Sequence, residues 1–229
     1  ECGSMVGSGK YSDLCVFSFH PVKIIAGGEG GMITTNSEDL YYKLLKLRTH
    51  GVNQNSNQIL NKDVGFTKNE KNMWYYEMTD LGYHYRQTDI HCALIYSQMD
   101  RIENFLSKRK KIASFYDLEF SKNNKYFIPQ NHLRNFSSNH LYTLNFDFEK
   151  NGITRNYLMS ELQKRNIITQ VHYIPVPIQY YYKKIGYNMK NLENAFKHYK
   201  HCISLPIYYD LNKYQQKFVI DSVNEILQN

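Results

Sequence analysis

The glycine-rich run from Gly27 to Gly31 is the feature that most constrains how this chain can fold. Four of its five residues are glycine, and it lies between two segments with β propensity, SDLCVFSF and GMITT. Glycine weakens the interior of a strand but takes up the positive φ angles that tight turns need. We therefore expect a strand on each side of the run, and glycines that let the backbone approach a ligand closely.

Lys23 lies between these two expected strands. A lysine on a strand normally belongs at a solvated edge, whereas a lysine in a partly desolvated pocket presents a neutral amine that is a good nucleophile. Ser18, five positions earlier, has a hydroxyl that can bind a phosphate group. Apolar residues that can form such a pocket flank the lysine: Phe17, Phe19, Val22, Ile24 and Ile25. From the residues alone, a structural and a catalytic lysine both remain open.

Length and composition indicate a folded protein. The chain has 229 residues, enough for one large domain or for a domain with a smaller companion. Hydrophobic residues make up 42% and charged residues 21%, which is typical of globular proteins. No apolar run is long enough to cross a bilayer, and the N-terminal residues lack the apolar core of a signal peptide. We therefore expect a cytoplasmic protein without a membrane partner.

Charge and potential metal ligands exclude other classes. The four cysteines are widely spaced and the nine histidines form no convincing ligand set, so we expect reduced thiols and no metal. The net charge of +7 permits an anionic partner. The densest basic run, KRKK at 108–111, has a helical setting that favours a solvated face over a nucleic-acid surface. We expect no nucleic-acid partner.

Periodicity predicts the remaining elements. A helix should begin after Ser37 and stop near Gly51, with three leucines on one face, Leu40, Leu44 and Leu47. The polar segment 52–73 has no period and is predicted to be a long loop. Thr88 or Asp89 should cap a very long or kinked helix that continues through KRKKIASFYDLEF and bridges two lobes.

The C-terminal part mixes both element types. HLYTLNFDF and NIITQVHYI are predicted strands, whereas TRNYLMSELQKRN and KYQQKFVIDSVNEIL are predicted helices. This order indicates a small α+β domain.

The motif SFHPVKxxxxGEGGMxTTN resembles the cofactor-lysine signature of the DegT-type sugar aminotransferases, which use pyridoxal phosphate (PLP). LRTHG at 47–51, WYYEMTDLGYHYRQTDIHCAL, NIITQVHYIPV and ISLPIY resemble further family segments in the same order. The likeness covers nearly the whole chain. The motif is closest in style to the branch that makes precursors of pseudaminic and related bacterial sugars.

The resemblance implies roles for particular residues. Lys23 matches the lysine that binds the cofactor covalently, and Ser18 matches the serine that contacts the cofactor phosphate. His84 stands where the family usually has an asparagine that reaches the cofactor phosphate of the neighbouring subunit, and histidine can also donate to phosphate. Further candidates for substrate binding are His20, Arg86, His172 and Tyr173. His20 can equally be a packed strand residue, and His172 can equally end a buried strand.

The resemblance also implies the fold, an α/β PLP-dependent transferase of fold type I. The chain is expected to lack the N-terminal half of the large domain, which in the family supplies the ring that stacks on the cofactor and the aspartate that pairs with its pyridinium nitrogen. Residues 1–112 are then the rest of the PLP-binding large domain with a linking helix, and 113–229 the small α+β domain. Pro177 and Phe196 also depart from the family pattern, which has a histidine and a glutamate there.

The implied activity is transfer of an amino group from glutamate to a nucleotide-linked (UDP) 4-keto-6-deoxy sugar, in a homodimer with shared active sites. Two alternatives stand beside it. One is the dehydratase or isomerase branch, in which histidine replaces the lysine, and Lys23 argues against it. The other is a catalytically inactive fragment that acts only as a structural or interaction module.

Overall fold

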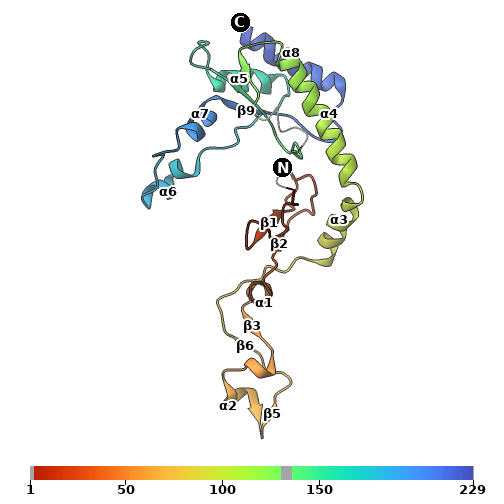
Figure 1. The fold of residues 1–229 in the computed structure, drawn as a ribbon, viewed down its shortest axis with the longest axis vertical. Helices are drawn as coiled ribbons and strands as arrows, with labels where there is room; N and C mark the ends of the chain where they lie inside the picture. Colours follow the sequence, from red (N-terminus) through yellow and green to blue (C-terminus); the bar gives the residue numbers. More distant parts are fainter. Residues whose placement is uncertain (1–2, 130–135, 229) are drawn as a thin grey trace. The chain divides into compact units, whose positions relative to one another are not determined.

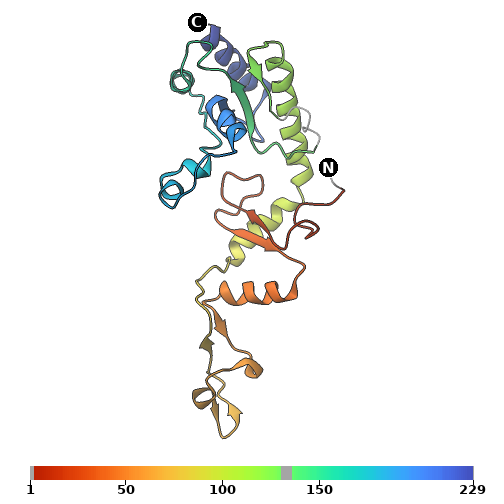
Figure 2. The same ribbon diagram turned by 60° about the vertical axis from the view of Figure 1, so that its left-hand side comes forward.

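The computed structural model describes residues 3–129 and 136–228, which form two compact units. The first unit extends to Asp100 and the second begins at Arg101. Figures 1 and 2 show the elements of each unit. The boundary between the two units falls between two consecutive helices. The sequence analysis set its domain boundary at residue 112, farther along the same helical region. The functional assignment of the two parts stays a prediction.

A hairpin and a helix open the first unit. Strand β1 (Cys15–Ser18) pairs antiparallel with β2 (Gly31–Thr34), and Ser18 lies opposite Gly31. Helix α1 (Glu38–Leu47) follows, and the Ser37 hydroxyl accepts the N–H of Leu40 at 3.3 Å. The two strands on either side of the glycine run and the Ser37 cap are therefore confirmed.

The segment 52–78, which we call the arm, is built from short elements. The prediction of a loop without secondary structure is wrong here, because polar side chains hold the backbone where apolar periodicity gives no signal. Its elements are β3 (Val52–Asn53), the 3₁₀ helix η1 (Ser56–Gln58), α2 (Lys62–Gly65), β4 (Phe66–Thr67), β5 (Glu70–Lys71) and β6 (Glu77–Met78). Strand β3 pairs with β6, and β4 pairs with β5.

The long helical region is divided into two helices. Helix α3 (Asp89–Met99) begins at Thr88, whose hydroxyl accepts the N–H of His91 at 3.3 Å. Helix α4 (Ile102–Phe120) starts after a break at Asp100 and Arg101. The Thr88 cap is confirmed, and the interruption agrees with the kinked form of the predicted helix.

The second unit is an α+β structure around a three-stranded antiparallel sheet in the order β7-β8-β9. The strands are β7 (Tyr126–Phe127), β8 (Tyr142–Phe146) and β9 (Cys202–Leu205). The helices after α4 are α5 (Arg155–Lys164), η3 (Val176–Ile178), α6 (Tyr180–Lys184), α7 (Glu193–His201) and α8 (Lys213–Gln228). The predicted α+β character of this part is confirmed, as are three of its four predicted elements.

The core of the second unit lies on one face of this sheet. Alternate residues of β8 are buried, as a strand with one core-facing side requires, and they are Tyr142, Leu144 and Phe146. They pack against apolar residues of α4, α5 and α8. The other face of β8 carries the polar residues Asn145 and Asp147, and α7 packs there.

The segment NIITQVHYI does not form the strand that its composition predicts. Only Gln170 pairs with the sheet, where its N–H and C=O exchange hydrogen bonds with Ser204. The 3₁₀ helix η3 then begins directly after Pro175. This proline has no N–H with which to continue the hydrogen bonds of a β-strand. The prediction is wrong beyond this single bridge.

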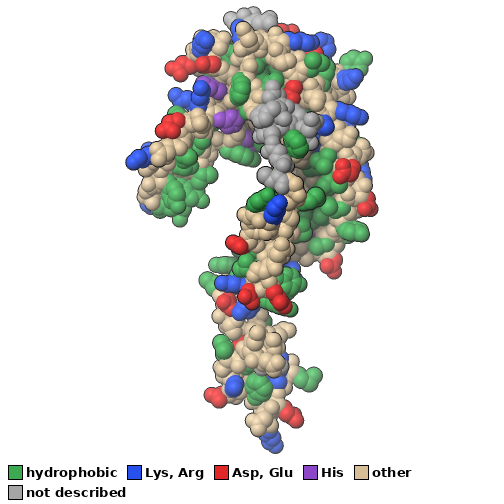
Figure 3. All heavy atoms as spheres, viewed as in Figure 1, with side chains coloured by type: hydrophobic (Ala, Val, Ile, Leu, Met, Phe, Trp, Pro, Cys, Tyr) green, Lys and Arg blue, Asp and Glu red, His purple; other side chains and the backbone are tan. Residues whose placement is uncertain are grey.

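Three features of the described residues concern possible membrane, metal and protein partners. None of the helices in the ranges described is both long and apolar enough to span a membrane. Within the same ranges, no cluster of three or more His, Cys, Asp or Glu side chains is placed to hold a metal ion. Figure 3 shows hydrophobic side chains at the surface over α6, where three tyrosines follow one another, Tyr180, Tyr181 and Tyr182.

Candidate active site

The loop that carries Lys23 is closed by backbone hydrogen bonds. The N–H of Phe19 donates to the carbonyl of Gly30 at 2.8 Å, and the N–H of Gly27 donates to the carbonyl of Phe19 at 2.9 Å. Inside this loop the N–H of Lys23 donates to the carbonyl of His20 at 2.9 Å. The lysine therefore lies on a turn beyond β1 and not within the strand.

The structure places Ser18 at the end of β1, directly before this loop, and His20 and Lys23 on the loop itself. The Ser18 hydroxyl accepts the N–H of His20 at 3.4 Å, and His20 Nδ1 accepts the N–H of Val22 at 3.3 Å. His20 Nε2 lies 4.0 Å from Glu29 Oε1, so this histidine is a loop residue exposed to solvent and not a packed strand residue. The Lys23 side chain is half-buried, and its amine has no hydrogen-bond or ion-pair partner in the described part of the chain.

The apolar surroundings predicted for Lys23 are only partly present. Ile25 is buried at 8% exposure, whereas the Val22 side chain is 64% exposed. Val22 faces solvent because it belongs to the tight turn that His20 closes.

The glycine run approaches helix α3 closely. A Cβ atom at Gly27 would lie 2.6 Å from the Ile95 side chain, and one at Gly30 would lie 2.5 Å from that of Gln87. Gly28 and Gly30 have φ angles of +85° and +145°, so the expected positive φ angles are confirmed. The close approach is therefore made to α3, and an approach to a ligand stays a prediction.

Two glutamines fix this loop on α3, and the sequence analysis did not identify them. The Gln98 side chain bonds both the N–H and the C=O of Ala26, and the Gln87 amide donates to the carbonyl of Glu29 at 2.7 Å. Within α3, His91, Ile95 and Gln98 recur at the helical spacing of one face, whereas Gln87 lies just before the Thr88 cap. The helical spacing of these residues was the signal from which this contact could have been predicted.

The segments LRTHG and TDLGYHYR pack tightly against each other. The carbonyl of Gly51 accepts the N–H of Thr79 at 3.0 Å, and a Cβ atom at Gly51 would lie 1.8 Å from the carbonyl oxygen of Asp80. Lys46 forms an ion pair with Asp80. The hydrogen bond from the Lys46 ammonium is the largest of the effects that lower the pKa of the Asp80 carboxyl. Only glycine allows two backbones to come this close.

His84 and Arg86 lie on this paired segment. His84 forms a β-bridge with Thr49, and its ring packs edge-on against that of His50 at a centroid distance of 5.5 Å. The Arg86 side chain is exposed, and its guanidinium has no partner among the residues described. The LRTHG segment therefore holds His84 at the surface of the first unit.

In the second unit, His172 is attached to strand β9. His172 Nδ1 lies 2.7 Å from the hydroxyl of Ser204, which is 5% exposed. The Cys202 thiol lies 4.0 Å from the His172 carbonyl oxygen, and burial raises the pKa of this thiol, which keeps its proton available to donate. Tyr173 packs edge-on against the His172 ring and is 65% exposed.

The reading of His172 as a residue that merely ends a buried strand is not supported, because no strand is formed there. Ser204 and Cys202 hold it from β9, and the sequence analysis had singled out only the segment ISLPIY that contains them. A contact between residues 32 positions apart has no local signal in the sequence.

Within the arm, the carboxylate of Glu77 binds the backbone of a neighbouring segment. Glu77 Oε1 accepts the N–H of Leu60 at 2.6 Å. Its Oε2 atom accepts the N–H of Asn61 at 3.1 Å and the hydroxyl of Tyr75 at 3.0 Å. The backbone hydrogen bond from Leu60 is the largest effect that lowers the pKa of Glu77. The ionised form is therefore the one that holds the arm.

We expect the arm to loosen on acidification. A carboxyl with a lowered pKa stabilises the fold fully above its ordinary pKa, and this stabilisation is lost as the pH falls through the lower pKa of the folded state. Amide hydrogen exchange at Leu60 and Asn61, corrected for intrinsic rates, should show reduced protection as the pH is lowered from neutral to below 4.5, the ordinary pKa of a glutamate. Glu77→Gln should remove this pH dependence. Unchanged protection of both amides across this range would contradict the role of Glu77.

Comparison with known proteins gives a consistent result. Residues 3–224 match the model of the DegT/DnrJ/EryC1/StrS aminotransferase family. The chain is 36% identical over 220 residues to UDP-4-amino-4,6-dideoxy-N-acetyl-beta-L-altrosamine transaminase of Campylobacter jejuni serotype O:2, covering 96% of this chain and 54% of that protein. It is 34% identical to the spore coat polysaccharide biosynthesis protein SpsC of Bacillus subtilis, covering 96% and 55%.

Solved structures agree. Helicobacter pylori PseC, an aminotransferase involved in the biosynthesis of pseudoaminic acid, superimposes with a TM-score of 0.80 at 28% identity, covering 95% of this chain and 54% of PseC. The PLP form of the putative sugar aminotransferase Spr1654 of Streptococcus pneumoniae superimposes with a TM-score of 0.77 at 27% identity, covering 96% and 53%. The chain spans about half the length of the relatives that it matches.

Proposed function

Because this chain belongs to the DegT/DnrJ/EryC1/StrS aminotransferase family, we propose that it acts in a PLP-dependent aminotransferase that transfers an amino group from glutamate to a UDP-linked 4-keto-6-deoxy sugar. The observation that carries the proposal is Lys23, which is half-buried and has no partner for its amine in the described residues. The work of such an enzyme is cytoplasmic biosynthesis of a bacterial surface sugar. The name of the Campylobacter jejuni relative, a transaminase named for a UDP-linked amino sugar, supports this substrate class.

The donor groups present fit pyridoxal phosphate. Lys23 offers a primary amine for the aldehyde of the cofactor, and the hydroxyl of Ser18 keeps its proton free to donate to phosphate because its oxygen only accepts from His20. The imidazole of His84 is a second donor of the kind that a phosphate requires. When bound, the cofactor serves as the electron sink of the reaction.

Lys23 has two tasks in this proposal. Its amine would hold the cofactor covalently until an amino donor is bound. The freed Nζ atom accepts the proton that leaves the α carbon of the donor and later returns a proton, as a general base and then a general acid. The glutamine contacts to Ala26 and Glu29 keep the loop of the lysine fixed during these steps.

The proposed contacts of the sugar nucleotide are His20, Arg86, His172 and Tyr173. His20 and Arg86 in the first unit, and His172 and Tyr173 in the second, offer hydrogen-bond donors and ring surface. The first 112 residues then serve the cofactor and the remainder forms the small domain of the enzyme.

The substrate experiment removes the nucleotide. With the protein expressed from its own gene, amination of the UDP-linked 4-keto-6-deoxy sugar should exceed that of the free sugar by at least about tenfold in kcat/KM, or ~1.4 kcal/mol, because binding of remote groups orients the reacting carbon. Lys62→Ala together with Lys68→Ala should raise KM more than it lowers kcat. Lys71 is unsuitable for this test, since its ammonium already binds the carbonyl of Gln54. Equal rates on both sugars would contradict the nucleotide requirement.

We further propose a two-fold homodimer in which His84 of one subunit serves the active site of the other. Mixing a Lys23→Ala protomer with a His84→Ala protomer should restore activity to about one quarter of the wild-type value, because half of the randomly mixed dimers then contain one intact site of two. Each variant alone serves as the control. Activity in the mixture that does not exceed the mean of the two variants would place both residues in the site of one subunit.

A further inference from the structure

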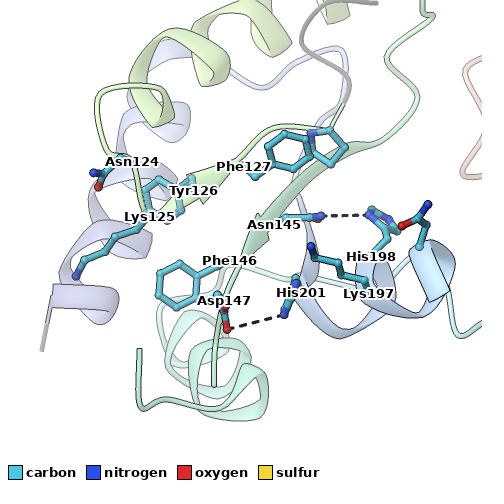
Figure 4. A pocket seen from close by; sticks show the side chains of 12 residues that line it. Asn124, Lys125, Tyr126, Phe127, Asn145, Phe146, Asp147, Lys197, His198 and His201 are labelled. Atoms are coloured by element: carbon cyan, nitrogen blue, oxygen red, sulfur yellow. Dashed lines mark hydrogen bonds and ion pairs between the residues drawn. The ribbon is translucent and has the colours of Figure 1, made fainter. Parts of the chain in front are cut away.

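A cavity of about 470 Å³ opens in the second unit, between the sheet and α7 (Figure 4). One wall is the polar face of β8, with Asn145, and Asp147 directly after the strand. The other wall is one face of α7, because Asn194, Lys197, His198 and His201 recur at the helical spacing. None of the residues assigned above to the cofactor or the sugar lines this cavity.

The cavity carries more cationic than anionic groups. Among the described residues that line it, the one acidic residue is Asp147, and His201 Nε2 lies 3.8 Å from its carboxylate. Lys125 and Lys197 also line the cavity, and neither ammonium has an ion-pair partner in the ranges that the structure describes. Figure 3 shows histidine and basic side chains gathered on the surface beside α7. Two uncompensated ammonium groups at one cavity favour an anionic ligand.

A buried polar atom at the same cavity lacks a partner. The Asn145 amide nitrogen lies 3.3 Å from His198 Nδ1, whereas Asn145 Oδ1 is buried and has no hydrogen bond. Turning the amide over would only exchange the two atoms, so one polar atom is left over in either orientation. Such an atom costs free energy unless a further group binds it.

We propose that this cavity binds a hydroxylated phosphate ester, such as a sugar phosphate. Lysines are point-charge donors suited to a phosphate group, whereas carboxylates are preferentially bound by the planar fork of arginine, and no arginine lines the cavity among the described residues. A hydroxyl of the ligand supplies the group that the leftover Asn145 atom requires. The volume of the cavity lies in the range of small-molecule sites and exceeds what an isolated phosphate ion needs.

Calorimetry with glucose 6-phosphate tests this site in the chain as it stands. The ester should bind more tightly than either inorganic phosphate or glucose alone. Lys197→Ala should weaken its binding by about tenfold, the effect of losing one charged contact (~1.4 kcal/mol). The matched control is Lys200→Ala, because Lys200 is an exposed lysine of the same helix that does not line the cavity, and this change should leave binding unaltered. Circular dichroism of both variants checks that the fold is retained.

Four results would overturn the proposal. Absence of saturable binding would show that the cavity holds water only. Equal weakening by both lysine variants would indicate non-specific charge attraction. Equal binding of glucose and its phosphate would exclude the phosphate group. Loss of binding in Ser18→Ala, with Lys197→Ala unaffected, would place the ester at the proposed cofactor site.

Discussion

Replacing Lys23 with alanine is expected to abolish transamination in the protein expressed from its own gene, together with the visible absorbance of the bound cofactor. The reason is that no other group can take over both the covalent bond and the proton transfer. General acid–base catalysis alone contributes about 10²–10⁴-fold, and loss of the nucleophile adds to it. Absorbance spectra and initial rates with a UDP-linked keto-sugar and glutamate measure the two effects.

Two further variants separate chemistry from structure. Lys23→Arg keeps the positive charge and most of the length but offers no comparable nucleophile, so it should be as inactive as Lys23→Ala. Lys43→Ala changes an exposed lysine of α1 and should retain activity. A Lys23→Ala protein that keeps both the absorbance and the turnover would show that Lys23 has only a structural role.

Replacing Arg109 with alanine is expected to lower the free energy of unfolding of the second unit by about 3 kcal/mol. This side chain of α4 is 8% exposed, and its Nη1 atom donates to the carbonyls of Asn139, His140 and Ile207 at 3.1 to 3.2 Å. Burial lowers the pKa of the guanidinium from its ordinary value. Its removal takes a charged donor away from three carbonyl groups, and the loss of a buried hydrogen bond is costly.

Denaturant unfolding followed by circular dichroism measures the change. Arg109→Lys keeps the charge but can reach fewer of the carbonyls, so its effect should be intermediate. Lys110→Ala, at the exposed neighbouring position, should stay within about 0.5 kcal/mol of the parent chain. If Arg109→Ala unfolded like Lys110→Ala, the three carbonyl contacts would contribute nothing measurable to stability.

Local signals in the sequence were sufficient for the helices of ten or more residues, which are α1, α3, α4, α5 and α8, and for three strands. Ser37 and Thr88 cap their helices as predicted, because an N-cap depends only on a side chain and the N–H group three residues later. The strands β1, β2 and β8 follow their apolar patterns. These features need no knowledge of distant residues.

Contacts between distant residues account for what the sequence did not reveal. The arm is held by hydrogen bonds from Glu77 to a segment 16 and 17 positions away, and the glycine loop is held by Gln98 at a separation of 72 positions. The segment around Gln170 has the composition of a strand but pairs with the sheet only at Gln170, where Ser204 supplies a hydrogen-bond partner. Propensity predicts which segments can pair but not which partner is present.

The candidate site likewise contains residues that are close in sequence and residues that are positioned by distant contacts. Ser18, His20 and Lys23 are close in sequence, and they lie at the end of β1 and on the closed loop that follows it. The positions of His84 and of His172 depend on packing against LRTHG and on Ser204, respectively, and these partners became visible only in the structure. The catalytic and binding roles of all these residues stay predictions.

The attachment point of the cofactor is the most direct test of this account. The protein from its own gene should be incubated with pyridoxal phosphate, reduced with borohydride, digested and mapped by mass spectrometry. Our account predicts the reduced cofactor on the peptide that contains Lys23, and on no other lysine at comparable yield. Attachment at a different lysine, or no attachment in a protein that still transaminates, would contradict the assignment of Lys23.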